Sequence, residues 1–322
     1  MTLPFQMYED LGHDITRIDT AMVHDELAAC YLLKGGDDYA VIETGTHNTV
    51  PIVLELLAQR GIQPSQVRYI IPTHVHLDHA GGVGGLMRAL TDATLLVHPR
   101  GARHLINPAK LKAGALAVYG EKTFTRIYGD VIPVDEARVR IMEDGERTIV
   151  GNRELVFYDT PGHAKHHFCV HDPVSNGIFT GDTFGIAYPA LVTENGPFML
   201  PTTTPVQFDP PALKASIRKL LDLTPERMYL THYGMVTNPQ PLGERLQGMV
   251  DDYVALAEKV ARHAGAGNLE AGLENAMRAY LFGQAREHGC RFDDEGLERL
   301  LGMDIKLNSQ GLAVWLRSAR VA

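Results

Sequence analysis

The sequence has little cysteine, no long apolar run and no excess of positive charge. Its three cysteines, Cys30, Cys169 and Cys290, are scattered and form no CxxC pair, which argues against a disulfide framework. No apolar stretch approaches the roughly 18 residues that a membrane-spanning helix needs. The first residues show no basic segment followed by an apolar one, so we expect no secretion signal. Together these absences predict a protein of the reducing cytoplasm.

The charge balance also narrows the class of partner. Lys and Arg total 30 against 39 Asp and Glu, which gives a formal net charge of −9 over 322 residues. A net acidic chain lacks the electrostatic pattern of a nucleic-acid binder, so we expect neither nucleic acid nor membrane as a partner. Hydrophobic residues make up 45% and charged residues 21%, as is typical of a globular protein. The length corresponds to one or two domains at about 150 residues each.

Strand and helix patterns alternate over the first 240 residues. β-rich runs at 29–33 and 39–45 flank a Gly-Gly-Asp-Asp turn and predict a hairpin. Residues 47–61 predict a helix with Pro51 in its first turn, and residues 100–120 predict another. A second hairpin is predicted at 139–150, with its turn at Asp144–Gly145. The pattern indicates two successive blocks of mixed α/β structure.

From about residue 242 the pattern is helical only. Leu246, Met249, Val250 and Tyr253 recur at helical spacing, and Leu273 begins a similar series. We therefore expect a catalytic domain over residues 1–240 and a helical C-terminal extension over 241–322. The extension is expected to be either a dimerisation surface, giving a homodimer, or a cover over the substrate cleft. The Pro-containing stretch 188–208 is longer than most loops and is a candidate lid.

Histidine is abundant, with 15 residues, and four potential metal ligands follow one buried strand. The segment His74-Val75-His76-Leu77-Asp78-His79 has the pattern HxHxDH. Side chains two apart on an extended chain point to the same side, so His74 and His76 share a face before the chain turns to Asp78 and His79. Imidazole and carboxylate suit zinc, iron or manganese. The pattern arises by chance on the order of once in 10³ chains of this composition.

Three further residues of ligand type follow strands elsewhere in the chain. His163 lies in the sequence TPGH, Asp182 in TGD and His232 in THYG. Each occupies the point where a predicted strand meets a loop, which is where α/β proteins build their sites. A single histidine of this kind is more often structural, but the set in this order predicts one metal centre.

The motifs HVHLDH, TPGH, TGD and THYG resemble those of the metallo-β-lactamase-fold hydrolases, particularly the glyoxalase II-like and lactonase-like branch. The resemblance covers about residues 15–240 and implies an α/β fold, a four-layer αββα sandwich. It implies that His74, His76 and His163 form a first metal site and that Asp78, His79 and His232 form a second. Asp182 is then the carboxylate that bridges both ions.

This resemblance implies a hydrolase with two divalent metal ions, zinc most of all, with iron and manganese as alternatives. Metal binding moves the pKa of a water from about 15.7 to near 7, which corresponds to about 12 kcal/mol of stabilisation of hydroxide. A bridging hydroxide would attack the carbonyl of a small-molecule ester, thioester or lactone, with Asp78 as the catalytic residue that orients it. No GxSxG motif offers a serine nucleophile instead.

The branch of the family stays open. A CGR-type sequence does not follow Asp182, which argues against a glutathione thioester, and Gly185 stands where lactonases of this fold carry tyrosine. The alternatives are a persulfide dioxygenase with one iron, which is an oxidoreductase of the same fold, and a catalytically inactive binding module. His166 and His167 are candidates for supporting the ligands. Tyr188 and Tyr233 are each either a hydrogen-bond donor to the substrate or a structural residue.

Overall fold

The computed structural model describes residues 6–203, 206–263 and 269–319, and these divide into two compact units. The first unit comprises Met1–Asp159, His166–Gly181 and Pro225–Thr237. The second comprises Thr160–Lys165, Asp182–Thr224 and Asn238–Ala322. All of the strands lie in the first unit, and the C-terminal helices lie in the second.

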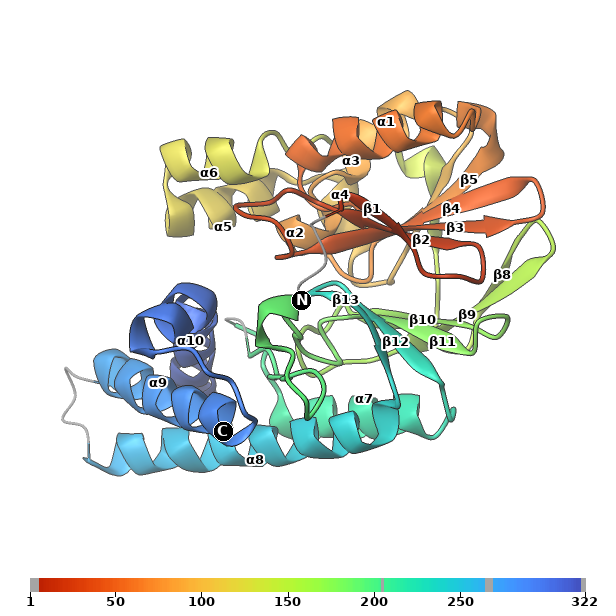
Figure 1. Ribbon diagram of the computed structural model, residues 1–322. Coiled ribbons are helices and arrows are strands. Elements are labelled where there is room, and N and C mark those ends of the chain that lie inside the picture. The colour runs from red at the N-terminus through yellow and green to blue at the C-terminus, as the bar shows by residue number, and fades with distance from the viewer. Residues whose placement is uncertain (1–5, 204–205, 264–268, 320–322) are drawn as a thin grey trace. The chain divides into compact units, whose positions relative to one another are not determined.

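The first unit contains a seven-stranded sheet whose strands follow their order in the chain (Figure 1). The first four strands pair antiparallel with one another, and the pairs from the fourth to the seventh strand are parallel. The predicted hairpin around Gly36 and Asp37 is confirmed, because it joins the third and fourth strands. The strands are β1 (Tyr8–Asp10), β2 (Ile15–Asp19), β3 (Ala29–Gly35), β4 (Asp38–Ile42), β5 (Val67–Ile71), β6 (Thr94–Val97) and β7 (Val139–Ile141).

A second sheet of six strands completes the first unit. Its order is β13-β12-β11-β10-β9-β8, and only the pair β11 and β12 is parallel. The strands are β8 (Arg147–Val150), β9 (Arg153–Asp159), β10 (Phe168–Asp172), β11 (Gly177–Gly181), β12 (Arg227–Leu230) and β13 (Gly234–Thr237).

An aromatic core fills the space between the two sheets. The Tyr31 ring meets Phe179 edge-on at 5.2 Å between ring centroids, and Phe179 stacks on Tyr229 at 4.6 Å. Phe157 and Phe168 meet edge-on at 5.0 Å. Aromatic side chains each bury roughly 150–250 Å², so this layer supplies much of the driving force that holds the sheets together.

Helices α1 (Val50–Gln59) and α3 (Val83–Ala89) cover the other face of the seven-stranded sheet (Figure 1). Pro51 lies in the first turn of α1, where its missing N–H leaves no hydrogen bond unmade. Val53 and Leu56 of α1 are buried together with Leu86 of α3. The predicted helix at 47–61 is confirmed, and its apolar stripe is what fixes it to the sheet.

The predicted hairpin at 139–150 is wrong. β7 belongs to the seven-stranded sheet and β8 to the six-stranded one, so the chain crosses between sheets at Asp144–Gly145. Met142 is buried at the crossing, and Asp144 Oδ1 accepts a 2.8 Å hydrogen bond from the Asp159 backbone N–H. An alternating pattern interrupted by Asp-Gly fits any two strands joined by a turn, so it does not show whether they pair.

Three short helices, α4 (Ala102–Ile106), α5 (Ala109–Tyr119) and α6 (Glu121–Tyr128), extend the predicted helical stretch to residue 128. Phe124, Tyr128 and Val131 are buried against Leu77, which lies within the HxHxDH segment. This small cluster anchors the start of α2 (Leu77–Ala80), the helix that carries two of the candidate ligands.

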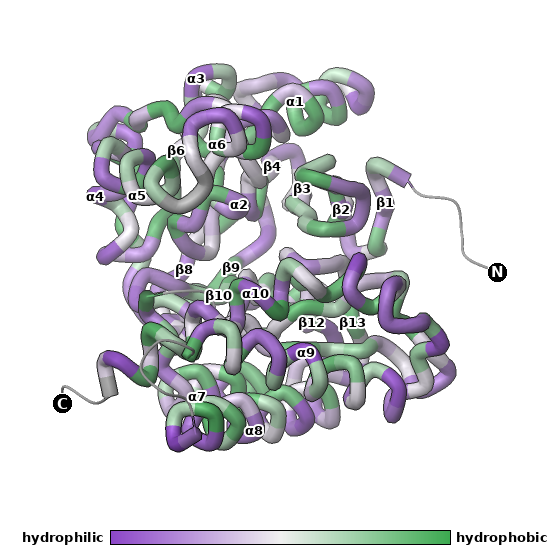
Figure 2. The backbone as a smooth tube through the Cα atoms, turned by 90° about the vertical axis from the view of Figure 1, so that its left-hand side faces the viewer, coloured by the Kyte–Doolittle hydropathy of each residue, from purple (hydrophilic) through white to green (hydrophobic). Residues whose placement is uncertain are grey.

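The second unit is helical and includes α7 (Pro210–Leu221), α8 (Pro239–His263), α9 (Leu269–Glu287) and α10 (Asp294–Ala319). Asp209 caps α7, since its Oδ1 accepts a 3.1 Å hydrogen bond from the Ala212 N–H. The tube of α8 alternates between hydrophobic and hydrophilic in Figure 2, as expected of an amphipathic helix. The predicted mixed α/β fold that ends in helices is confirmed.

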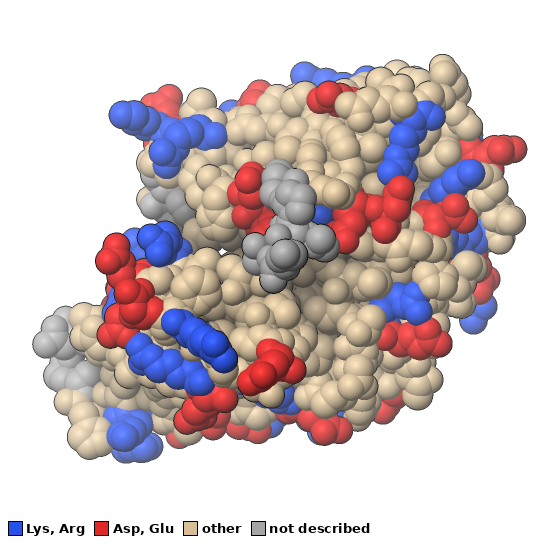
Figure 3. Space-filling model, in the orientation of Figure 1, with Lys and Arg blue, Asp and Glu red and all other residues tan. Residues whose placement is uncertain are grey.

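The distribution of surface charge and the hydropathy of the helices both agree with the composition. On the face seen in Figure 3, acidic and basic side chains are interspersed. Among the described residues, no helix combines the length and the apolar character that a membrane crossing needs.

Candidate metal centre

The HxHxDH segment begins three residues after β5 ends at Ile71. His76 is the N-cap residue of α2, Asp78 lies in the first turn of this helix and His79 in the last. The backbone N–H of His79 and that of Ala80 both bond to the His76 carbonyl, at 3.0 and 2.8 Å. The short helix therefore turns the chain sharply enough to bring residues 76–79 onto one side.

Asp78 lies between two imidazoles. Its Oδ2 is 3.6 Å from Nε2 of His79 and 3.4 Å from Nε2 of His232, which sits in the turn between β12 and β13. The three residues each offer a ligand atom, and these atoms lie within 4.8 Å of one another. Residues 78 and 232 are far apart in the chain, so the fold has brought the predicted second metal site together.

Both imidazoles are oriented through their other nitrogen. His79 Nδ1 lies 2.9 Å from Glu43 Oε1, and His232 Nδ1 lies 2.8 Å from the Leu27 carbonyl oxygen. An oxygen acceptor requires a proton on Nδ1, and the neutral ring then has Nε2 unprotonated, the form that ligates a metal through that atom. Each ring is therefore held in the tautomer and direction that ligation through Nε2 needs.

Glu43 is a candidate supporting residue of this centre that the sequence analysis missed. Its carboxylate is buried and accepts hydrogen bonds from the Thr73 backbone N–H (3.0 Å), the Thr73 hydroxyl (2.6 Å) and the Thr231 hydroxyl (2.9 Å), besides facing His79. It therefore joins the segments that precede His74 and His232. The one signal in the sequence is an acidic residue directly after the apolar end of β4.

His74 and His76 face each other, with 2.8 Å between His74 Nε2 and His76 Nδ1. The Thr73 hydroxyl lies 3.1 Å from His74 Nδ1, and the ring of His74 also lies 4.0 Å from that of His79. Of the seven predicted ligands, the first unit thus brings together His74, His76, Asp78, His79 and His232.

Two further histidines lie against this group. The His167 ring is 4.9 Å from His74, and the His166 ring is stacked on His74 at 6.1 Å. His104 on α4, which the sequence analysis did not single out, lies 6.1 Å from His166. Gly181, at the end of β11, has a φ of +49°, and a Cβ there would lie 2.5 Å from His167 Nε2. Only glycine leaves room for this approach.

The other two predicted ligands, His163 and Asp182, lie in the second unit. Their side chains are buried, and His163 Nε2 is 3.3 Å from Asp182 Oδ2. The Nδ1 atom of His163 lies 2.6 Å from the Thr202 hydroxyl. His163 is thus oriented in the same way as His79 and His232, with Nε2 toward a carboxylate and Nδ1 toward an oxygen.

The two tyrosines considered in the sequence have partners within the protein. The Tyr188 hydroxyl donates to the carboxylate of Asp304, 3.1 Å from Oδ2. The ring of Tyr233 lies under the Arg17 guanidinium at 4.5 Å, and burial raises the pKa of its hydroxyl, as does the nearby Asp19 carboxylate. These contacts favour structural roles for both.

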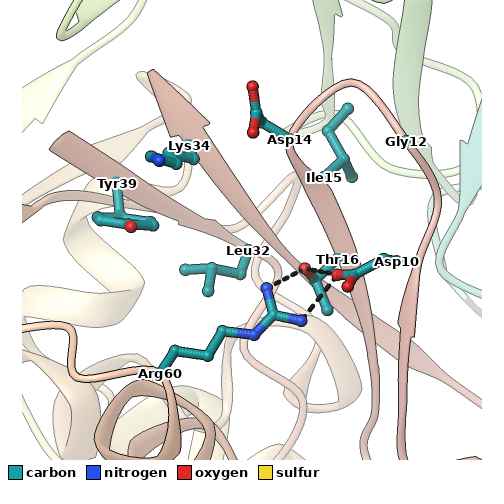
Figure 4. A pocket seen from close by; sticks show the side chains of 9 residues that line it. All are labelled: Asp10, Gly12, Asp14, Ile15, Thr16, Leu32, Lys34, Tyr39 and Arg60. Carbon is teal, nitrogen blue, oxygen red and sulfur yellow. Dashed lines mark hydrogen bonds and ion pairs between the residues drawn. The ribbon is translucent and has the colours of Figure 1, made fainter. Parts of the chain in front are cut away.

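A polar hollow of about 420 Å³ lies elsewhere in the first unit (Figure 4). Within it the Arg60 guanidinium donates to Asp10 Oδ1 at 2.7 Å and to the Thr16 hydroxyl at 2.6 Å. Asp10 Oδ1 also accepts a 2.6 Å hydrogen bond from the Thr16 hydroxyl, and this bond, followed by the one from Arg60, lowers the pKa of the Asp10 carboxyl. The candidate ligands are not among its lining residues, which are Asp10, Gly12, Asp14, Ile15, Thr16, Leu32, Lys34, Tyr39 and Arg60.

The donor set fits a metal of the zinc, iron or manganese type. Within the first unit, Asp78, His79 and His232 offer two imidazole nitrogens and a carboxylate oxygen. These three atoms lie close enough together to coordinate one ion. Their supporting hydrogen bonds are those that metal-binding histidines in proteins usually make.

Comparisons with known proteins give a matching family model and several similar proteins and structures. The family model described as the metallo-beta-lactamase superfamily matches residues 25–232. A metallo-beta-lactamase fold-containing protein of Sulfurisphaera tokodaii is 28% identical over 229 residues, which cover 70% of this chain and 79% of the relative. The human acyl-coenzyme A thioesterase MBLAC2 is 26% identical over 168 residues, 48% of this chain and 57% of that protein. The crystal structure of a metallo-beta-lactamase family protein from Thermus thermophilus has a TM-score of 0.64 at 20% identity, covering 96% of this chain and 95% of the other.

Proposed function

The chain belongs to the metallo-beta-lactamase superfamily, and from this premise we propose that it is a metal-dependent hydrolase of a small-molecule ester, thioester or lactone. The observation that carries the proposal is the position of Asp78 between His79 and His232. Both rings present Nε2 to the same carboxylate while their Nδ1 atoms are engaged elsewhere. Such mutual orientation is what a metal site needs, and a purely structural histidine cluster does not require it.

We further propose that two divalent ions are held, zinc being the first expectation and iron or manganese the alternatives. His74, His76 and His163 would hold one ion, Asp78, His79 and His232 the other, and Asp182 would bridge them. Chain connectivity supports a shared site. Asp182 directly follows β11, and the segment Thr160–Lys165 that carries His163 joins β9 to β10.

Divalent ions at this site would supply an acidified water as nucleophile and would polarise the substrate carbonyl. The protein's own contribution is positional. Asp78 offers a carboxylate oxygen that can orient the nucleophile and hold its proton, and it is half-buried, so a substrate can approach it. Glu43 and the Leu27 carbonyl keep the neighbouring rings from rotating away.

The thioester is the substrate class that the relatives favour. The name of the human relative states an acyl-coenzyme A thioesterase, and that protein matches about half of this chain. A thioester carbonyl is activated, and its thiolate leaves without help from a residue that protonates it. This chemistry suits a site whose residues position a nucleophile. No nucleic acid or membrane is involved in this proposal.

The proposal is tested by assaying thioesters, aryl esters and lactones with protein as purified, protein stripped with chelator, and stripped protein reloaded with zinc, manganese or iron. We expect hydrolysis of at least one class, lost on stripping and restored by metal. Oxygen consumption with a persulfide, in place of any hydrolysis, would overturn the proposal in favour of the iron dioxygenase alternative.

A further inference from the structure

The C-terminal helix α10 makes a row of contacts with the loop at residues 188–208. Asp304, Asn308, Gly311 and Trp315 are spaced by four, three and four residues, so they lie on one face of the helix. Asp304 accepts from the Tyr188 hydroxyl, and the Trp315 ring lies 6.5 Å from Phe208. The two central residues of the row contact the loop near Thr203. This helix lies outside the range that the family model matches, which ends at residue 232.

Asn308 holds the loop on both sides of Thr202. Its Oδ1 accepts from the Thr203 backbone N–H at 2.7 Å, and its backbone carbonyl accepts from the Thr203 hydroxyl at 3.0 Å. Its Nδ2 donates to the Pro201 carbonyl at 3.3 Å. The side chain is 2% exposed. A buried amide that satisfies the backbone of residues 201 and 203 fixes the position of residue 202 between them.

Gly311 allows the helix to come this close. A Cβ at position 311 would lie 1.5 Å from the Thr203 carbonyl oxygen, which is far inside any allowed contact. The helix and the loop backbone therefore meet directly, and a side chain at this point would force them apart.

The loop in turn orients His163. The Thr202 hydroxyl lies 2.6 Å from His163 Nδ1, and both side chains are buried. Asp182 is tied to the same loop, because Ile186 and Leu200 pair through hydrogen bonds of 2.9 and 3.1 Å just before Pro201. Both candidate ligands of the second unit thus depend on the stretch that α10 holds.

We propose that the C-terminal helix is a positioning element for the metal centre, in which Asn308 fixes Thr202 and Thr202 fixes the tautomer and direction of His163. An imidazole that binds metal through Nε2 donates its Nδ1 proton to a neighbouring oxygen, and the Thr202 hydroxyl is that oxygen here. The inference rests on the proposed function, since it assigns His163 as a metal ligand.

The test compares Thr202→Val with Thr202→Ser, and Asn308→Leu with Ser309→Ala. Valine keeps the shape of threonine without its hydroxyl, whereas serine keeps the hydroxyl. Ser309 is a matched control, because it is buried on the same helix and its hydroxyl donates to Ile305 within that helix. The readouts are zinc affinity measured by chelator competition, the visible spectrum of the cobalt-substituted protein, and thermal unfolding.

We expect Thr202→Val and Asn308→Leu to weaken the binding of one of two zinc ions by about 10–100-fold, the usual effect of losing a partner of a ligand. The cobalt spectrum should change with it, and Thr202→Ser and Ser309→Ala should resemble the wild type. If Asn308→Leu fails to fold, the comparison of Thr202→Val with Thr202→Ser is sufficient to test the inference.

Wild-type affinity and an unchanged cobalt spectrum in folded Thr202→Val would overturn the inference and leave the proposed function standing. A Thr202→Ser variant as impaired as Thr202→Val would also overturn it, because the hydroxyl would then not be what matters. A wild-type protein that binds no zinc or cobalt would instead overturn the proposed function, and the inference with it.

Discussion

At the scale of single residues, the candidate metal centre depends on the oxygen atom that faces Nδ1 of each imidazole. His79 and His232 meet Asp78 through Nε2, and an oxygen faces the opposite nitrogen in each ring. The fold itself thus sets the ring orientations that ligation through Nε2 requires.

We predict that His232→Ala loses one of two bound metal ions and most of the activity. The loss of affinity should exceed about 100-fold, because removal of a ligand costs more than the roughly 10–100-fold lost with a supporting partner. Elemental analysis of the dialysed variant measures the number of metal ions that stay bound. His263→Ala is the control, since His263 is exposed and contacts the Lys259 carbonyl within α8. Equal loss in both variants would contradict the assignment.

We predict that Glu43→Gln weakens metal binding by about 10–100-fold although Glu43 itself is not a proposed ligand. Glutamine has an NH₂ group in place of one carboxylate oxygen, and this group cannot accept the hydrogen bonds that the carboxylate receives from Thr73, Thr231 and His79. Chelator competition gives the affinity. Glu55→Gln is the matched control, because Glu55 is exposed on α1 and pairs with Gln59. Unchanged affinity in Glu43→Gln would show that this carboxylate serves stability alone.

The sequence indicates the candidate ligands that lie close together in the chain, but not the residues that orient them. HxHxDH is recognisable because His74 to His79 share one turn of chain. Glu43 lies 30 residues before Thr73, and Asn308 lies 105 residues after Thr203, so neither pair leaves a local spacing to read. The fold alone creates these contacts.

At the scale of elements, a buried ion pair joins two strands of the second sheet. Arg153 on β9 donates from Nε to Asp172 Oδ1 on β10 at 2.8 Å, and from Nη1 to the His13 carbonyl at 2.6 Å. Burial raises the pKa of Asp172, but its bonds to Arg153 and Ser175 outweigh burial, so the pKa is lowered overall. The pair thus connects β9, β10 and the loop before β2.

We predict that Asp172→Asn destabilises the protein by about 3–5 kcal/mol at pH 7, because it leaves the Arg153 charge buried without its partner. The wild-type carboxylate stabilises the fold above its unfolded pKa of about 3.8, and this contribution is lost as the pH falls through the lower folded value. The difference between wild type and variant should therefore shrink below about pH 4. Denaturant unfolding from pH 3 to 7 tests this, with exposed Asp222→Asn as control. A difference that stays constant with pH would contradict the account.

Elements with a strong local signal were predictable, and their pairing was less so. α1 follows from its apolar stripe and Pro51, whereas β7 and β8 resemble a hairpin and belong to different sheets. The candidate lid at 188–208 is buried over residues 198–203, so its length alone gave no indication of its packing. Pairing partners are chosen by tertiary contacts, which an alternating pattern does not encode.

At the scale of the whole molecule, the division into a catalytic domain at 1–240 and a helical extension stays a prediction, as does a homodimer through the C-terminal helices. The compact units divide the chain differently, since the second one also includes Asp182–Thr224. Sedimentation measurements on wild type and on α10 surface variants would test the dimer.

We predict that the whole fold is stabilised by zinc and not by calcium. Metal at 100 times its dissociation constant adds about 2.7 kcal/mol to the free energy of unfolding, which raises the Tm by several degrees in a protein of this size. Calcium prefers six to eight oxygen ligands and should leave the histidine-rich centre empty. Differential scanning calorimetry of stripped protein with each ion measures the shift. An equal shift with calcium would contradict a histidine-based centre.

The most direct measurement is the identity and number of metal ions on the protein as purified without added metal, determined by elemental mass spectrometry. The account predicts about two zinc, manganese or iron ions per chain, and about one or fewer in His232→Ala. One iron per chain with little else, together with persulfide-dependent oxygen consumption, would contradict the dinuclear hydrolase.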